Sequence, residues 1–488
     1  MELLQGHSAF TGLFWFGVLS FILIIIYNLY FHPLSKIPGP WTAAVSECFK
    51  IVELHNKYGK AVRIAPNEVS FNTAQSWKDI YGQRQGHQLF LKGAFYGGGV
   101  FATSGITSII SESRPEVHRE MRGYLSGAFS DRAVVEQEEL VAQSIDKFIR
   151  LVDVRGSGPK GVDMSIMFES MTFDIVGDLA FGESFGALDS NKHHPWISNF
   201  LDSLTGMVIT DISIRYALLG KALQILKRTE IKRSAAKVEC HEQRCFEAVR
   251  RRILKKTDRK DFLTRILQDR DPKVVSDMQI AAHSSDLLIA GSDTTATGLT
   301  GILYYLLQFP STMAKLNAEI RGTFDQYKQI NHASTTPLQY LRGVILEGIR
   351  LYPPVSVALP RIVPQGGDTV DGYFLPAGVT VGTSHLAASL SPENFRDPLS
   401  FKPERWIGSN TDDILESSQP WLLGPRSCIG RNLAWLELRT TIAKLVWTYD
   451  LQLVNPTLDL HGGSKVLAVL WRKPEMMIRV KNRGVAID

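Results

Sequence analysis

The chain has 488 residues, of which 44% are apolar and 21% charged, and this ordinary globular balance excludes a disordered or collagen-like protein. The formal net charge of +5 is too small over this length to indicate a nucleic-acid-binding protein. The four cysteines (Cys48, Cys240, Cys245 and Cys428) are scattered and lack zinc spacing, so we expect a reducing compartment.

The first segment of the chain is uncharged. Residues 3–35 contain no Asp, Glu, Lys or Arg, and 9–31 are almost wholly apolar. As a helix, that stretch would be about 34 Å long, enough for a bilayer core of about 30 Å. A cleaved signal peptide is the alternative, but Glu2 stands where a basic region is expected and no small-residue cleavage site follows. We predict a lumenal N-terminus at 1–8 and a single transmembrane anchor at 9–31.

Lysines follow the predicted anchor, whereas no Lys or Arg precedes it, so the body of the chain is expected on the cytosolic side. Residues 32–40 contain Pro33, Pro38 and Pro40, which cannot continue a helix and predict a stiff hinge. Beyond the hinge the only linker candidate is 155–161, which is short enough to be a loop. We therefore expect one large catalytic domain at 41–488.

Helical periodicity dominates this body. Apolar residues recur at spacings of three and four over 134–151, 164–181, 277–307, 312–324 and 338–351. Short strand patterns occur near 62–71, 371–374 and 379–381. The expected fold is mainly α with a minor β-sheet. The basic stretch 221–261 is typical of the solvated face of one or two long helices, and contact with anionic membrane lipid is the alternative.

One cysteine stands in an unusual setting near the C-terminus. Gly424, Arg426 and Gly430 surround Cys428, and a helical pattern begins just after them. A lone cysteine is commonly a small core residue. Here the glycines allow a large planar group to approach closely, and the free N–H groups at a helix start favour a thiolate.

Two further motifs precede this cysteine. Glu347 and Arg350 lie one turn apart in an apolar helical pattern, and Arg405 follows in Pro403-Glu404-Arg405-Trp406. Such a pair alone is commonly a modest surface ion pair. Earlier, Ala290-Gly291-Ser292-Asp293-Thr294-Thr295 lies inside a long apolar helical pattern, where a threonine commonly bonds a carbonyl one turn back.

The order of the three motifs resembles the cytochrome P-450 family, the haem-thiolate monooxygenases. The cysteine segment is similar to the family pattern F-x-x-G-x-R-x-C-x-G, with Trp421 in place of Phe. The resemblance implies the cytochrome P-450 fold and haem b, with Cys428 as the axial thiolate ligand of the iron. Thiolate ligation favours cleavage of the O–O bond.

The same resemblance assigns roles to further residues. Glu347, Arg350 and Arg405 would form a buried structural cluster, and Asp293 and Thr294 would relay protons to dioxygen. The small Ala290 and Gly291 would leave room for dioxygen, and Phe101 would belong to the apolar wall of the substrate pocket. Cations would hold the haem propionates, with His118 replacing the usual Trp of W-x-x-x-R. The residues implied in this role are His118, Arg122, Arg361 and Arg426.

Segments at 31–34, 118–130 and 173–182 look most like fungal microsomal members of the family. The implied enzyme lies in the endoplasmic reticulum membrane and hydroxylates or epoxidises a hydrophobic polyketide, terpenoid or alkaloid. NADPH and flavins would act only through a partner reductase, with cytochrome b5 as a further donor. Two alternatives stay open: a haem-thiolate isomerase or dehydratase that needs no reductase, and a non-catalytic membrane haem-binding protein.

Overall fold

The computed structural model describes residues 26–39, 51–98, 104–190, 194–199, 217–255, 257–408, 411–467 and 469–487, with isolated positions at 15, 19–20, 23, 101, 206, 208–209 and 212–213. The predicted anchor at 9–31 lies mostly outside these residues. Within them, no helix is both long enough and apolar enough to cross a membrane.

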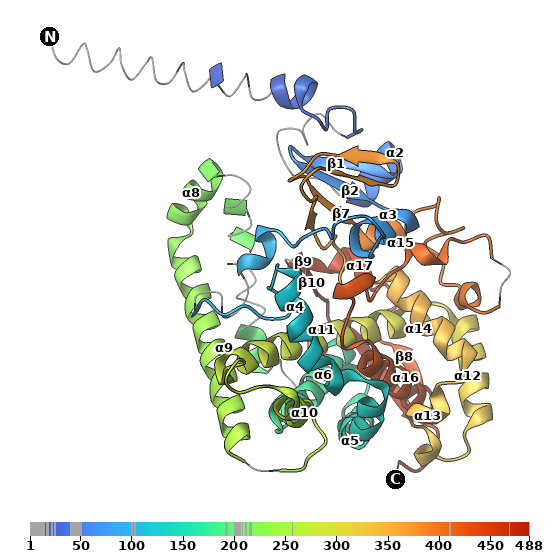
Figure 1. The fold of residues 1–488 in the computed structure, drawn as a ribbon. Helices are drawn as coiled ribbons and strands as arrows, with labels where there is room; N and C mark the ends of the chain where they lie inside the picture. Colours follow the sequence, from blue (N-terminus) through green and yellow to red (C-terminus); the bar gives the residue numbers. More distant parts are fainter. Residues whose placement is uncertain are drawn as a thin grey trace.

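Helices make up most of the described chain (Figure 1). They are α2 (Ile51–Tyr58), α3 (Ala74–Tyr81), α4 (Pro115–Ser126), α5 (Asp131–Gly156), α6 (Met164–Phe181), α8 (Ala217–Leu226), α9 (Arg228–Leu254), α10 (Phe262–Asp269), α11 (Asp277–Gln308), α12 (Pro310–Thr323), α13 (His332–Thr335), α14 (Gln339–Leu351), α15 (His385–Ser389), α16 (Arg431–Thr448) and α17 (Leu460–Gly463).

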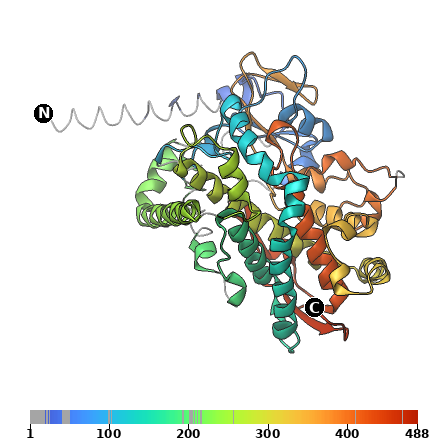
Figure 2. The same cartoon turned by 60° about the horizontal axis from the view of Figure 1, so that its bottom comes forward.

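The strands form small separate sheets. Their bounds are β1 (Ala61–Ala65), β2 (Glu68–Phe71), β3 (Val162–Asp163), β4 (Arg361–Ile362), β5 (Asp368–Val370), β6 (Tyr373–Leu375), β7 (Thr380–Thr383), β8 (Tyr449–Leu453), β9 (Lys465–Leu467), β10 (Leu470–Arg472) and β11 (Met477–Asn482). The largest sheet has the order β1-β2-β7-β4, with β2 and β7 parallel. A three-stranded sheet has the order β3-β11-β8. In both views, the β1–β2 sheet and the C-terminus of the chain lie towards opposite ends of the molecule (Figure 1, Figure 2).

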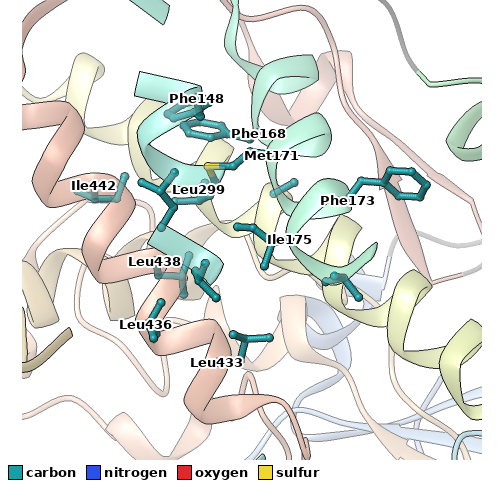
Figure 3. Close-up of a cluster of buried hydrophobic side chains, with 14 of the residues drawn as sticks. Phe148, Phe168, Met171, Phe173, Ile175, Leu299, Leu433, Leu436, Leu438 and Ile442 are labelled. Atoms are coloured by element: carbon teal, nitrogen blue, oxygen red, sulfur yellow. The ribbon is translucent and has the colours of Figure 1, made fainter. Parts of the chain in front are cut away.

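Helix α11 runs through the centre of the molecule and is apolar on several faces, because it packs on α6, α9, α14 and α16. Figure 3 shows the middle of this core, where Leu299 of α11 meets Met171 of α6 and Leu438 of α16. The three side chains are at most 3% exposed. This packing holds α11 and the start of α16 in one fixed arrangement, and those two elements carry the motifs found in the sequence.

The prediction of a mainly helical fold with minor sheets is confirmed. Helix α6 covers the predicted 164–181, since Asp163 accepts from the Ser165 N–H at its start and Gly182 ends it with φ +76°. The predicted strand at 371–374 is displaced, because Asp371 occupies a turn with φ +45° and β6 begins at Tyr373. The sheet β3-β11-β8 was not predicted.

The predicted hinge packs against the body over its described part. Leu34 is fully buried and Ile37 is 8% exposed, both in the core cluster that contains β2 and α3. The Arg63 N–H donates to Pro38 O over 2.9 Å, which joins this segment to β1. Residues 32–39 are therefore seated on the β1–β2 sheet.

Candidate active site

The Cys428 loop is held by backbone contacts from three directions. The Cys428 N–H donates to Trp421 O over 2.8 Å, and Arg122 of α4 donates to Ser427 O over 2.8 Å. Gly424 has φ +71°, and a Cβ on it would lie 2.1 Å from Tyr81 O at the end of α3. Only glycine fits that position. The loop therefore depends on α3 and α4 as well as on α16, which begins at Arg431.

The side chain of Cys428 is accessible, and so is that of Ala290 on α11, although both elements are otherwise largely buried. Burial by the surrounding protein raises the pKa of the Cys428 thiol, while the Gly430 N–H and the charges of Arg122 and Arg431 oppose that rise. The thiol thus has neighbours that favour a thiolate, and a bound metal ion would favour it further.

Two small residues of the α11 motif have different roles. Thr294 Oγ1 donates to Ala290 O over 2.6 Å, so the hydroxyl takes the carbonyl of the preceding turn. We expected Gly291, like Ala290, to leave room for dioxygen. A Cβ on Gly291 would instead lie 2.8 Å from Val176 Cγ2. Its small size serves the close packing of α11 on α6.

Asp293 points to another partner than Thr294. Its Oδ1 lies 2.8 Å from Lys473 Nζ, which also lies 2.9 Å from Glu169 Oε1. Lys473 is 1% exposed and the two carboxylates are 12% and 8% exposed, so this is a buried triad. Burial raises the pKa of Asp293, and Lys473 opposes that rise. The described contacts do not join Asp293 to the Thr294 hydroxyl, so a relay between them needs water.

The four predicted propionate-binding residues gather from three parts of the chain. Arg361 Nη1 donates to Tyr96 Oη over 2.6 Å and to Pro360 O over 2.9 Å. Arg426 donates to Glu112 O over 2.7 Å and to Ser113 O over 2.8 Å. Arg122 and the buried His118 lie one turn apart on α4. Their mutual repulsion and burial lower the pKa of Arg426 to about 10 and that of His118 to about 3.

Lys92 joins this cluster and was missed in the sequence. It is 9% exposed, and its Nζ lies 5.0 Å from the centre of the Tyr96 ring. Burial, with the charges of Arg426 and Arg361, lowers the pKa of Lys92 to about 6. A single lysine within the apolar run Phe90-Leu91-Lys92-Gly93-Ala94-Phe95 is the signal that could have pointed to it.

The charge balance of this cluster indicates an anionic ligand. No ion pair with a carboxylate is found for Lys92, Arg122, Arg361 or Arg426 among the residues that the structure describes, and Glu112 is paired with Arg114. Buried cations without counter-charges are costly unless a ligand supplies the negative charge. Beside an accessible thiol, the cluster fits a group that carries both a metal and carboxylates.

Behind this site, Glu347, Arg350 and Arg405 come together. Arg350 donates to both oxygens of Glu347 over 2.8 Å, and Arg405 Nε donates to Glu347 Oε1 over 3.1 Å. Trp406 Nε1 adds a bond to Glu347 Oε2 over 2.9 Å. Glu347 and Arg350 are fully buried. The cluster ties α14 to the segment that leads into the Cys428 loop.

A cavity of about 30 Å³ lies beside Asp293. It is lined by Glu169, Phe173, Trp196, Ile197, His241, Leu288, Ile289, Ser292 and Asp293. A space of this size holds about two water molecules. It is therefore too small to be a substrate pocket. Phe101, which we expected in the substrate wall, is 1% exposed and belongs to the main core.

Comparisons with known proteins give the family of the chain. The family model described as Cytochrome P450 matches residues 40–478. The chain is 44% identical over 440 residues to cytochrome P450 monooxygenase ORF11 of Penicillium roqueforti, covering 88% of this chain and 91% of that protein. It is 41% identical over 478 residues to cytochrome P450 monooxygenase BipB of Cochliobolus sativus, covering 94% of each.

A third relative is cytochrome P450 monooxygenase BOT4 of Botryotinia fuckeliana, 37% identical over 98% of this chain and 92% of that protein. In structure, the chain is similar to the cytochrome P450DA heme domain, with a TM-score of 0.68 over 85% of this chain and 88% of that one, at 18% identity. The chain belongs to the cytochrome P450 family. It is a monooxygenase, an oxidoreductase that incorporates molecular oxygen, and its family implies haem with a cysteine thiolate ligand.

Proposed function

We propose that Cys428 is the thiolate ligand of haem b, and that His118, Arg122, Arg361 and Arg426 bind its two propionates. Lys92 adds a fifth group to this set. The observation that carries the proposal is the cluster of buried cations without carboxylate partners beside an accessible thiol. Neutral His118 still donates a hydrogen bond to a carboxylate.

When bound, haem supplies a thiolate-ligated iron that activates dioxygen. The residues of the chain then have separate tasks. Arg122 and the Gly430 N–H favour the thiolate form of Cys428, against the burial that raises the pKa of its thiol. The Thr294 hydroxyl donates its hydrogen bond to Ala290 O, so its oxygen is free to accept a hydrogen bond from water. Asp293 is the nearest buried carboxyl on α11, and we propose that it supplies protons to that water.

Glu347, Arg350 and Arg405 are proposed to be structural. Arg350 also donates to Ser389 O and Pro398 O, Arg405 also pairs with Asp413, and Glu347 also accepts from Trp406, so each charged group of the cluster has partners within the chain. Their task is to hold the segment before the Cys428 loop in register with α14.

We further propose that the substrate is a hydrophobic secondary metabolite, a polyketide, terpenoid or alkaloid, which is hydroxylated or epoxidised. The apolar, partly exposed Val355, Val357 and Val466 support this chemistry. Electrons would come from NADPH through a flavoprotein reductase, with cytochrome b5 as a further donor. The names of the fungal relatives support the monooxygenase class and leave the substrate open.

The proposed location is the endoplasmic reticulum membrane, with a single anchor at 9–31 and the catalytic part in the cytosol. The apolar, uncharged composition of 3–35 supports it. A chain that lacks residues 1–31 should move from the carbonate-washed membrane fraction to the supernatant of expressing cells. Complete extraction of the full chain by carbonate would contradict the anchor.

The haem-thiolate assignment is tested by the reduced carbon monoxide difference spectrum of the wild type and of Cys428→Ala. We expect a Soret band near 450 nm in the wild type only. Cys240→Ala serves as the matched control and should keep the band, since Cys240 is an exposed cysteine on α9. A band absent from the wild type, or present in Cys428→Ala, would overturn the assignment.

Turnover with and without the reductase separates the alternatives. A monooxygenase needs NADPH, reductase and dioxygen, so product should disappear when any of the three is omitted. Product that persists without the reductase would indicate an isomerase or dehydratase. Haem binding without product under all conditions, with extracts of metabolites supplied, would indicate a non-catalytic haem-binding protein.

A further inference from the structure

The segment 104–113, here called the distal loop, contains no helix or strand. Its backbone-to-backbone bonds are local: Ser104 and Ile106 donate to Phe101 O, and Glu112 donates to Ser108 O. Within the part of the chain that the structure describes, no backbone bond joins the loop to a helix or sheet elsewhere. Its position therefore depends on side chains from other elements.

Three side chains of α11 bind the backbone of this loop. Gln279, His283 and Asp286 are spaced by four and three residues, which places them on one face of the helix. His283 is fully buried and Asp286 is 8% exposed. The contacts run from Gln279 Nε2 to Thr107 O, from Ile109 N to His283 Nδ1 over 3.2 Å and from Ile110 N to Asp286 Oδ2 over 3.0 Å.

His283 joins the loop to a second helix. Because Nδ1 accepts from the Ile109 N–H, a neutral His283 carries its proton on Nε2. Nε2 lies 2.6 Å from Tyr124 Oη on α4. Burial lowers the pKa of His283 to about 3, so the ring is neutral at ordinary pH. One imidazole thus connects α11, the distal loop and the helix that carries Arg122.

The other side of the loop is held from the cation cluster. Lys92 Nζ donates to Ile109 O over 3.3 Å and to Ile110 O over 2.5 Å. Arg426 donates to Glu112 O and Ser113 O at the end of the loop. Residues of α11 therefore bind the N–H groups of Ile109 and Ile110, and Lys92 binds the C=O groups of the same two residues. In every one of these contacts, a side chain from outside the loop binds a backbone group of the loop. Substitution of the loop's own side chains therefore does not remove the groups that form these bonds.

The loop lies beside the accessible face of α11. Asp286, Ala290 and Thr294 follow one another at four-residue steps and share one face of the helix. Asp286, which binds the Ile110 N–H, precedes Ala290 by about one helical turn, roughly 6 Å along the helix axis. The Ile110 side chain is 43% exposed. The loop therefore forms an apolar wall next to the part of α11 that faces the proposed cofactor.

We propose that Gln279, His283 and Asp286 are specificity-determining positioning residues: by fixing the backbone of the distal loop, they set the size of the hydrophobic molecule that can approach Thr294. The proposal rests on the proposed function, because the space beside Thr294 is the substrate's only if haem binds at Cys428. The buried Ile109 packs into the main core, and the three α11 residues add the polar contacts that fix the backbone on either side of it.

The first test is amide hydrogen exchange on peptides that cover 104–113, measured on the purified full chain. Asp286→Leu removes the acceptor of the Ile110 N–H at similar volume, whereas Asp286→Asn keeps an acceptor oxygen. We expect exchange in the loop to become about tenfold faster in Asp286→Leu. In Asp286→Asn it should stay close to the wild type. Asp277→Leu is the matched control, because Asp277 starts the same helix and pairs with Arg270.

The second test reads the size limit. The holoenzyme is titrated with imidazole and with the bulkier clotrimazole, and binding is read from the shift of the Soret band, so that the ratio of the two dissociation constants reports the space beside Thr294. In Asp286→Leu we expect this ratio to change by at least about fivefold in favour of clotrimazole, relative to the wild type and to Asp277→Leu. Gln279→Leu, which breaks another contact of the same set, should change it in the same direction if Asp286→Leu does not fold.

The outcomes are separable. Unchanged exchange in both Asp286→Leu and Gln279→Leu would overturn the proposal, because the loop would then be held by other contacts. Faster exchange with an unchanged azole ratio would also overturn it, since the residues would be merely structural. A wild type that binds no haem would refute the proposed function, while the exchange experiment would still report whether the loop is held from α11.

Discussion

Lys473 and Asp293 form a buried ion pair, with 2.8 Å between Nζ and Oδ1. The residues lie on different elements, since Lys473 follows β10 and Asp293 is in the middle of α11. Lys473 also binds Glu169 of α6, so one ammonium bridges two carboxyl groups in the interior. The acid of the α11 motif is therefore held by a cation that the motif itself does not contain.

Removal of this cation should destabilise the protein strongly. In Lys473→Met, two buried carboxylates lose their counter-charge, and we expect the free energy of unfolding to fall by about 3–5 kcal/mol. The loss should shrink as the pH falls, because protonation removes the unpaired charges. Urea unfolding at two pH values measures both effects. Lys402→Met breaks an exposed pair with Asp397 and should cost about 1 kcal/mol or less; an equal loss in both variants would contradict the buried triad.

The Cys428 loop gives a second prediction through its glycines. Gly424→Ala places a Cβ 2.1 Å from Tyr81 O at a φ of +71°, so the loop or α3 must shift. We expect a loss of more than about 2 kcal/mol in the free energy of unfolding and a smaller 450 nm band per chain. Gly430→Ala is the matched control for unfolding, since its Cβ meets nothing within 4 Å. Similar losses in the two variants would argue against this geometry.

The Glu347 cluster predicts a contrast between a buried and an exposed carboxylate. Glu347→Gln leaves Arg350 and Arg405 without their shared counter-charge, at an expected cost of about 3–5 kcal/mol. Glu404→Gln removes the exposed partner of Lys315 and should cost about 1 kcal/mol or less. Thermal or urea unfolding of the two variants measures the difference. A tolerated Glu347→Gln would show that the cluster is dispensable for stability.

Much of this arrangement could be predicted from local sequence. Helix α6 was predicted at its observed bounds from the spacing of its apolar residues, and in the structure Asp163 and Gly182 cap its two ends. The Cys428 loop could be recognised from its glycines, and Gly424 indeed has a positive φ, which glycine adopts without strain. The residues of the Glu347 cluster were named in advance because their order before the Cys428 segment resembles the family pattern, although a Glu–Arg pair one turn apart is common by itself.

The parts that were missed depend on partners distant in the chain. In the sheet β3-β11-β8, Val162 pairs with Ile478; β11 alternates apolar and polar residues, but β3 has only 2 residues and shows no pattern that names its partner. Lys473 stands in a polar stretch, where nothing in the local pattern places it beside Asp293. The role of Gly291 was misjudged for the same reason, because its neighbour Val176 belongs to α6. Local patterns indicate elements, whereas long-range charge pairs follow from packing.

Lys92 predicts a pH dependence in the haem-depleted chain. Its pKa is lowered from 10.5 to about 6 in the folded protein, mainly by burial. Between these values the unfolded chain carries a proton on Lys92 that the folded chain does not. The free energy of unfolding of the wild type should therefore rise with pH above about 6, by up to about 1.4 kcal/mol per pH unit from this group.

Lys92→Met removes that contribution, so its unfolding free energy should rise less steeply than that of the wild type. Urea unfolding at about pH 6.5 and about pH 8.5 measures the two slopes. Lys315→Met, at an exposed position, should keep the wild-type slope. In the haem-loaded protein the difference between Lys92→Met and wild type should shrink, because two propionates would restore the charge of the amine and raise its pKa. Parallel slopes for wild type and Lys92→Met without haem would show that Lys92 is charged in the folded chain and has a counter-charge there.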